Sequence, residues 1–275
     1  MSVNWLEVSV PAPLETQDDL LARLIMEGFE YFHIEEDCVK LYFPPDDAGE
    51  LERLRGLVPS VSIAERCEDE WAEAWKRYYK PAPIGEKLLI QPAWLEVEPT
   101  NRAVYLNDPG MAFGTGLHAS TRLCLEILES LDLAGKRVLD IGCGSGILGL
   151  CALLLGAESA VGVDIDPYAV RTAKENAGLN GVDGRFTAFA GDYLTDNSVR
   201  ESAGAFDVAF SNIVADIIIP LVPVMTPWLK DGTQWITSGI IEHRLDDVLS
   251  VAENAGLTAK TVRVEDGWAA VVFGV

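Results

Sequence analysis

The residues best suited to chemistry surround a glycine-rich turn. The segment "VLDIGCGSGILGL" ends an apolar run at Ile141, continues through Gly142, Gly144 and Gly146, and then takes helical spacing. Glycines at such a turn adopt backbone angles that other residues avoid, and they let a ligand approach the main chain. Asp164 ends the next apolar run, 22 residues after Gly142, where its carboxylate can accept hydrogen bonds from both ribose hydroxyls. The spacing predicts a nucleoside-containing cofactor.

Two cofactors fit this turn. Gly144, Gly146 and Gly149 also match the GxGxxG pattern of dinucleotide sites, which is weak on its own. Asp140 precedes the glycines, and its carboxylate suits the sulfonium and amino groups of S-adenosylmethionine but would repel a pyrophosphate. Asp192 ends a third apolar run, where it can accept a hydrogen bond from an adenine amino group. These features, with the closing hairpin described next, favour S-adenosylmethionine over a nicotinamide cofactor.

Apolar runs of buried-strand length alternate with helical stretches in the second part of the chain. They span residues 137–144, 159–166, 185–192, 206–214 and 232–240. Such runs indicate a parallel sheet covered on both faces. Two last strands, at 259–266 and 268–275, are too close for a helical crossover and must form a hairpin, as in methyltransferase sheets. We therefore predict a Rossmann-like, seven-stranded class I S-adenosylmethionine-dependent methyltransferase domain over residues 85–275.

A smaller domain precedes this one. Residues 1–67 read as strand, helix, strand, strand, helix, strand, which predicts a ferredoxin-like α+β domain. Residues 68–84 form a charged, aromatic-bearing helix stopped by Pro81 and Pro83, and we interpret them as a linker. The expected fold class is thus α/β, with the small α+β domain at the N-terminus.

The composition bears on where the protein is located and on which metal or disulfide sites it can form. The chain has 275 residues, of which 49% are hydrophobic, and its longest apolar stretch, residues 147–157, is far shorter than the roughly 20 residues that span a bilayer. The N-terminus has no basic segment followed by an apolar core, so we expect a cytoplasmic protein without membrane contact. The five cysteines form no CxxC pair and the histidine spacing suggests no metal site. Cys143, with no base beside it, is interpreted as packing.

The charge is strongly negative. The net charge is −22, and residues 1–75 alone hold 18 acidic and five basic residues, a net of −13. This balance argues against broad contact with the phosphates of a nucleic acid. It fits either a solvated acidic surface or a domain that attracts a basic protein.

Several longer motifs carry a family resemblance. They are "NDPGMAFGTGLHASTRLCLEILE", "VLDIGCGSGILGL", "VGVDIDPYAVRTAKENAGLNGV", "SNIVADII" and "SGIIEHRLDDVL". Over about residues 75–275 the chain resembles the ribosomal protein L-eleven (L11) methyltransferase family, also called PrmA. The resemblance implies an S-adenosylmethionine-dependent enzyme that methylates lysine side chains and the N-terminal amine of one basic large-subunit ribosomal protein, chosen by the N-terminal domain. It also implies that Thr121, Gly142, Asp164 and Asn212 hold the cofactor.

Three residues are candidates for the reaction itself. Asn212 ends the fourth predicted strand beside the expected methyl position, where its amide oxygen can accept a hydrogen bond from the attacking amine; alternatively it caps the next helix. Phe113 lies in a glycine-rich loop that resembles a mobile cover, and it can shield the amine or contact its cation. The alternative is an ordinary turn with Thr115 or Ser120 as helix cap. His118 can relay a proton or make a structural hydrogen bond.

Other functions remain open at this stage. A methyltransferase of this kind can act on another basic protein, as a relative does on lysines of an electron-transfer flavoprotein subunit, or on a small molecule. A nicotinamide-dependent oxidoreductase would use the same glycine turn, and a silent binding module is disfavoured because the cofactor-contacting residue types are present. We expect a monomer.

Overall fold

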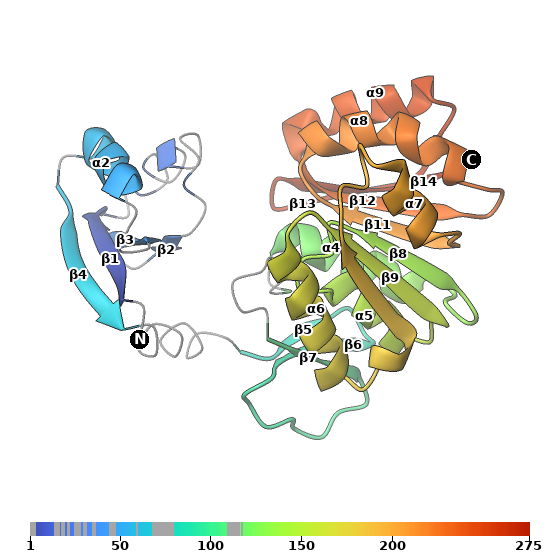
Figure 1. Ribbon diagram of the computed structural model, residues 1–275, viewed down its shortest axis with the longest axis horizontal. Helices are drawn as coiled ribbons and strands as arrows, with labels where there is room; N and C mark the ends of the chain where they lie inside the picture. The colour runs from blue at the N-terminus through green and yellow to red at the C-terminus, as the bar shows by residue number, and fades with distance from the viewer. Residues whose placement is uncertain are drawn as a thin grey trace. The chain divides into compact units, whose positions relative to one another are not determined.

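The structure, a computed structural model, describes residues 4–13, 17, 20, 23–24, 29, 32–34, 37–43, 48–58, 60–67, 80–108, 116 and 118–275. The chain separates into two compact units, an N-terminal unit of residues 1–79 and a C-terminal unit of residues 80–275 (Figure 1). The boundary falls within the predicted linker, most of which lies outside the described residues, as does Phe113. The domain boundaries proposed from the sequence stay a prediction.

The N-terminal unit is built on a four-stranded antiparallel sheet. Its elements are β1 (Asn4–Pro11), β2 (Phe32–Ile34), β3 (Cys38–Phe43), α2 (Ala48–Leu57) and β4 (Ser62–Cys67). The strand order is β2-β3-β1-β4, the order of a ferredoxin-like sandwich. Burial alternates along β3, because successive side chains of a strand point to opposite faces, so Val39, Leu41 and Phe43 face the core. Leu54 of α2 lies in the same core.

A seven-stranded sheet forms the centre of the C-terminal unit. Its strands are β8 (Arg137–Ile141), β9 (Ser159–Asp164), β10 (Phe186–Ala190), β11 (Val208–Asn212), β12 (Gln234–Ile241), β13 (Thr258–Glu265) and β14 (Trp268–Gly274). They lie in the order β10-β9-β8-β11-β12-β14-β13, with β14 antiparallel to both its neighbours. The predicted fold class, including the closing hairpin, is confirmed. Ligands of such sheets bind at the carboxyl edge where the strand order reverses, here between β8 and its neighbours β9 and β11.

Helices cover both faces of this sheet (Figure 1). They are α4 (Ala119–Ser130), α5 (Ile147–Leu154), α6 (Pro167–Leu179), α7 (Asn197–Ala203), α8 (Ala215–Met225) and α9 (Leu245–Asn254). Helices α4, α5 and α6 share one core with Val138 and Phe210, whereas α7, α8 and α9 share the other with Leu139 and Ala209. Adjacent residues of one strand are thus buried on opposite faces, which explains the unbroken apolar runs of the sequence. Among the described residues no helix is long and apolar enough to cross a membrane.

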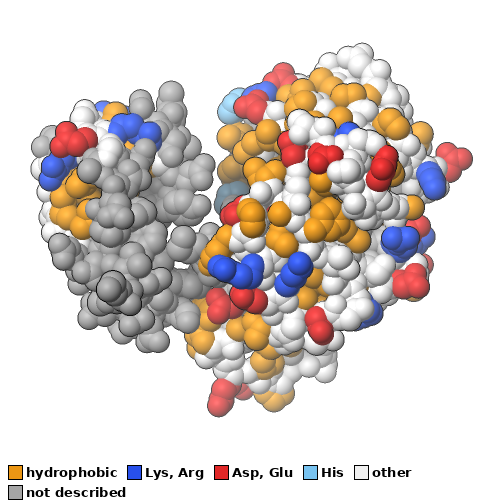
Figure 2. Space-filling model, in the orientation of Figure 1, with side chains coloured by type: hydrophobic (Ala, Val, Ile, Leu, Met, Phe, Trp, Pro, Cys, Tyr) orange, Lys and Arg blue, Asp and Glu red, His pale blue; other side chains and the backbone are white. Residues whose placement is uncertain are grey.

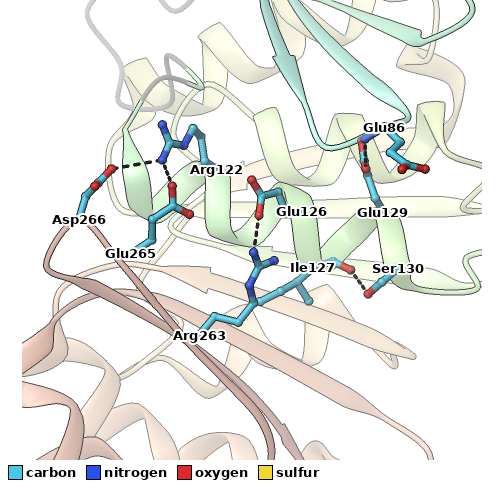
Figure 3. A network of polar contacts seen from close by, with 9 residues as sticks. All are labelled: Glu86, Arg122, Glu126, Ile127, Glu129, Ser130, Arg263, Glu265 and Asp266. Atoms are coloured by element: carbon cyan, nitrogen blue, oxygen red, sulfur yellow. Dashed lines mark hydrogen bonds and ion pairs between the residues drawn. The ribbon is translucent and has the colours of Figure 1, made fainter.

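A second, three-stranded sheet was not predicted. It consists of β5 (Ala82–Ile84), β6 (Leu88–Pro92) and β7 (Ala103–Asn107), in that order. Strand β5 takes up the last residues of the predicted linker. The turn between β5 and β6 is held by Glu129 of α4, whose carboxylate accepts hydrogen bonds from the backbone N–H groups of Glu86, Lys87 and Leu88 at 2.7 to 2.9 Å. One charged side chain therefore attaches the sheet to α4 (Figure 3).

Ion pairs fasten the exposed side of α4 to the hairpin of β13 and β14. Arg122 bonds to Glu265 and, at 3.2 Å, to Asp266 in the hairpin turn, and Arg263 bonds to Glu126 at 2.5 Å (Figure 3). All these side chains are partly exposed, so each pair stabilises the fold by about 1 kcal/mol or less. Together they join α4 to the edge of the sheet at β13.

Candidate active site

The glycine-rich turn leaves strand β8 at the carboxyl edge of the sheet. Gly142, Gly144 and Gly146 have φ angles of 71°, 53° and 83°, all in the left-handed region that favours glycine. A Cβ atom on Gly142 would lie only 2.5 Å from the Cγ2 atom of Ile213, so no larger residue fits there. The turn thus requires glycine at these positions before α5 begins.

Asp164 connects this turn to the end of β9. Its Oδ2 atom accepts a hydrogen bond from the Gly144 N–H at 2.9 Å, and its Oδ1 atom accepts one from the Asp166 N–H at 3.0 Å. Each carboxylate oxygen has a second lone pair, so the half-buried side chain can still receive two hydroxyl donors. The next residue, Ile165, is 76% exposed and offers an apolar surface beside it. Sequence analysis missed Ile165, although an apolar residue directly after a strand-end acid was a usable signal.

Asp140 lies beneath the turn and is 1% exposed. Its Oδ2 atom accepts a hydrogen bond from the Gly149 N–H at 2.9 Å. Burial raises the pKa of this carboxyl group to about 7; the Gly149 hydrogen bond opposes the shift, and the negative charge of Asp164 adds to it. One oxygen is therefore committed to the first turn of α5, and contact between Asp140 and a cofactor stays a prediction.

Asp192 follows strand β10, at the same edge of the sheet. Its carboxylate accepts hydrogen bonds from the Leu194 N–H at 2.8 Å, the Thr195 N–H at 3.3 Å and the Thr195 hydroxyl at 2.6 Å. The Thr195 hydroxyl contributes most to lowering the pKa of this group. These hydrogen bonds stabilise the turn that follows β10 at Asp192 to Thr195. The contact of Asp192 with an adenine amino group stays a prediction.

Asn212 ends strand β11 and meets α4. Its Nδ2 atom donates to the Thr121 hydroxyl at 3.1 Å, and Thr121 is fully buried in the first turn of α4. This bond fixes the amide, so the Oδ1 atom points the other way; it is buried and has no hydrogen-bond partner in the described structure. A buried amide oxygen without a donor costs about 1 to 3 kcal/mol and calls for a functional explanation. Asn212 does not cap the next helix, because the N-cap of α8 is Val214.

His118 is the N-cap of α4. Its Nδ1 atom accepts a hydrogen bond from the Ser120 N–H at 3.3 Å and lies 2.8 Å from the Ser120 hydroxyl oxygen. Its ring meets the Trp268 ring edge-on, with 4.6 Å between centroids, and burial lowers its pKa. The alternative of Ser120 as the helix cap is wrong, because His118 is the cap, and Thr115 lies outside the described residues. The contacts of His118 agree with the alternative that it makes a structural hydrogen bond. A role for His118 in relaying a proton stays a prediction.

Comparisons with known proteins agree with this geometry. The family model described as "Ribosomal protein L11 methyltransferase (PrmA)" matches residues 5–274. The chain belongs to this family. The "Ribosomal protein L11 methyltransferase" of Synechococcus elongatus is 37% identical over 290 residues, covering 99% of this chain and 97% of that protein. The protein of the same name from Caldanaerobacter subterraneus subsp. tengcongensis is 42% identical over 239 residues, covering 84% of this chain and 75% of its own.

A solved member of the family has the same fold. The crystal structure of ribosomal protein L11 methylase from Lactobacillus delbrueckii subsp. bulgaricus superposes with a TM-score of 0.65 at 29% sequence identity. The match covers 71% of this chain and 98% of that one. The resemblance seen in the sequence motifs is confirmed. It extends to the N-terminal unit, since the family model begins at residue 5.

Two asparagines that sequence analysis missed support the site of this family member. Asn176 of α6 is fully buried; its Nδ2 atom donates to the Ser145 carbonyl at 3.0 Å, and its Oδ1 atom accepts from the Asp108 N–H at 3.1 Å. One helical turn later, Asn180 binds both backbone groups of Leu106 at 2.7 and 2.8 Å. The pair therefore joins the glycine turn to residues 106–108, where the motif "DPGMAFGTG" starts. The usable signal was two asparagines at i and i+4, the first inside the helix, where asparagine is a poor residue type, and the second at its C-cap.

The three cysteines of this unit pack as small hydrophobic side chains. Cys124, Cys143 and Cys151 are 0%, 4% and 0% exposed. Burial raises the thiol pKa of each one. Cys143 therefore lies in the glycine turn as a protonated thiol, in line with its interpretation as packing. Among the described residues, no group of three or more His, Cys, Asp or Glu side chains is arranged to hold a metal ion.

Proposed function

We propose that this member of the family transfers methyl groups from S-adenosylmethionine to amino groups of large-subunit ribosomal protein L11, at lysine side chains and the N-terminus. The observation that carries the proposal is the Oδ1 atom of Asn212, which is buried without a donor at the carboxyl edge of the sheet. A substrate amine supplies the donor that this oxygen lacks. Membership of the family supports both the cofactor and the substrate.

The sheet edge fits the cofactor. Gly142, Gly144 and Gly146 turn the main chain at this edge in the left-handed region, Asp164 keeps lone pairs for ribose hydroxyls, and Ile165 offers an apolar surface to a base. S-adenosylmethionine, when bound, supplies an electrophilic methyl group on a positively charged sulfur. The residues that would hold it are Thr121, Asp140, Gly142, Gly144, Gly146, Asp164, Asp192 and Asn212.

Asn212 would orient the attacking amine. A lysine side chain has a pKa near 10.4 in water, and only its neutral form has a free lone pair. The Oδ1 atom accepts one N–H of the neutral amine, while Thr121 holds the amide in place from the other side. A neutral amide suits this task better than a carboxylate, because a carboxylate would stabilise the protonated ammonium form. The proton of the amine is lost to water, and alignment is the main contribution of the protein.

The acidic N-terminal part fits a basic substrate protein. Residues 1–75 carry a net charge of −13, and charge of this sign steers positively charged partners toward the surface. The second candidate is methylation of another basic protein by the same site. A nicotinamide-dependent oxidoreductase is no longer an alternative for a chain of this family. We expect the reaction in the cytoplasm, where ribosomal proteins are made, with the enzyme as a monomer.

The test uses recombinant L11 and labelled S-adenosylmethionine, with the modified residues mapped by mass spectrometry. We expect methylated lysines and a methylated N-terminus. In the Asn212→Ala variant we expect kcat to fall by about 100-fold, because a misaligned amine loses the contribution of orientation. Affinity for S-adenosylhomocysteine should change less than tenfold. Asn197→Ala, which changes an exposed asparagine of α7, is the control and should leave kcat unchanged.

The outcomes separate the two parts of the proposal. If the wild-type protein binds S-adenosylhomocysteine but leaves L11 unlabelled, the substrate is a different basic protein. If L11 is labelled and Asn212→Ala turns over like the control, the orienting role of Asn212 is wrong.

A further inference from the structure

Three large apolar side chains are exposed just beyond Asn212. Val214, Ile217 and Ile241 are 59%, 42% and 46% exposed, and we call them the apolar rim. Val214 caps α8 and its carbonyl accepts the N–H of Ile217 at 3.0 Å, while Ile241 ends strand β12. Figure 2 shows hydrophobic side chains among the charged ones on the surface of the C-terminal unit. Clustered apolar exposure of this kind marks an interaction surface more often than isolated exposed residues do.

The two segments that carry the apolar rim lie against each other. The Ile213 N–H donates to the Ser238 carbonyl at 3.1 Å, and a Cβ atom on Gly239 would lie 2.5 Å from the Ile213 carbonyl oxygen. Farther out, Arg244 bonds to Asp216 at 2.8 Å. The start of α8 and the end of β12 therefore form one continuous surface.

This surface borders the proposed methyl-transfer site on two sides. Asn212 comes two residues before Val214 in the chain. Ile241 pairs with Trp268 in the ladder of β12 and β14, and the Trp268 ring rests against His118 at the N-terminus of α4. The apolar rim is therefore placed to contact a protein segment that delivers an amine to Asn212.

Acidic side chains surround the apolar rim. Asp216 and Asp247 both bond to Arg244, which leaves one negative charge in excess, and Glu242 is exposed next to Ile241. The side chain of Asp216 is 74% exposed and that of Asp247 is 57% exposed. Apolar contacts inside an acidic border are complementary to an apolar residue inside a basic sequence.

We propose that the apolar rim is the docking surface for the chain segment that flanks the methylated amine, and that this segment presents an apolar side chain between basic residues. The proposal rests on the proposed function and adds where the substrate protein is held. Covering the apolar rim removes water from around the amine. Desolvation favours the neutral amine that the reaction needs, so docking and activation are coupled.

The test is the Ile217→Lys/Ile241→Lys double variant. The matched control is Leu179→Lys/Val262→Lys, which adds the same two charges at apolar residues that are 48% and 44% exposed at the end of α6 and on edge strand β13. We expect KM for L11 to rise about tenfold in the rim variant, equivalent to about 1.4 kcal/mol. Its affinity for S-adenosylhomocysteine should stay within twofold of the wild type. The control should match the wild type in its KM for L11 and in its affinity for S-adenosylhomocysteine.

A second pair of variants separates apolar contact from charge repulsion. In Ile217→Ser/Ile241→Ser we expect a smaller rise in KM, of about threefold, with unchanged cofactor affinity. This serine double variant also serves as the test if the lysine double variant does not fold. Equal KM values in the rim variants and the control, with active wild-type enzyme, overturn the docking proposal alone. A wild-type enzyme that leaves L11 unmodified overturns the proposed function, and the docking proposal with it.

Discussion

The buried carboxyl group of Asp140 makes the stability of the C-terminal unit depend on pH. In the unfolded chain this group loses its proton near pH 3.9, whereas in the folded protein burial holds its pKa at about 7. Between these two values the folded state binds more protons than the unfolded state. The free energy of unfolding contributed by Asp140 therefore falls as pH rises through this window, and the full loss is reached above pH 7.

The size of the effect follows from the two pKa values. A difference of about three pKa units corresponds to about 4 kcal/mol, of which about 2 to 3 kcal/mol develops between pH 5 and pH 8. The Asp140→Asn variant does not titrate there, and its amide oxygen can still accept the Gly149 N–H. The difference in unfolding free energy, variant minus wild type, should therefore increase by about 2 to 3 kcal/mol from pH 5 to pH 8.

The measurement is urea unfolding of both proteins across this range, read by pulsed hydrogen exchange of the β8 peptide so that only the C-terminal unit is followed. Saturating S-adenosylhomocysteine should flatten the difference, because an amino group beside Asp140 favours its charged form. A difference that stays constant within about 0.5 kcal/mol from pH 5 to pH 8 would refute the raised pKa. An unchanged slope with ligand would instead remove Asp140 from the cofactor site.

Three further substitutions test the scaffold. Gly142→Ala places a side chain at a φ of 71° and 2.5 Å from the Ile213 Cγ2 atom, so the turn or Ile213 must move, and we expect about 2 kcal/mol less stability and more than tenfold weaker S-adenosylhomocysteine binding by calorimetry; normal binding would show that the cofactor does not depend on the conformation of this turn. Asn176→Ala removes the donor to the Ser145 carbonyl and the acceptor of the Asp108 N–H, and should lower the unfolding free energy by about 1 to 3 kcal/mol and also weaken binding. Glu129→Ala should cost about 3 kcal/mol with binding unchanged, because Glu129 lies about 12 Å along α4 from the site; weakened binding would show that α4 transmits the change.

The central sheet was predictable because its pattern is local. Val138 and Leu139 are adjacent and are buried on opposite faces, so β8 appears in the sequence as an unbroken apolar run. The closing hairpin was predictable for a different reason. Asp266 and Gly267 form its turn at positive φ, and two residues cannot accommodate a crossover between parallel strands.

The parts that were missed depend on partners far apart in the chain. Glu129 holds a turn about 42 residues away, and Asn176 joins backbone groups 31 and 68 residues before it. The periodic pattern of neighbouring residues in the sequence does not reveal such contacts. The helix cap at His118 was missed because serine and threonine are the usual caps, although a neutral imidazole nitrogen can also accept the N–H. Asn212 was identified as a candidate from its position, yet only the structure shows that its Oδ1 atom lacks a donor.

The buried cysteines of the C-terminal unit have a consequence for redox chemistry. Nucleophilic attack and oxidation require a thiolate with access to solvent, and Cys124, Cys143 and Cys151 offer neither. Iodoacetamide or dilute hydrogen peroxide should therefore leave S-adenosylhomocysteine binding by the C-terminal unit intact, even though Cys143 lies in the glycine turn itself. A cofactor site built this way keeps its glycine turn unmodified under oxidative stress that inactivates thiol-dependent enzymes.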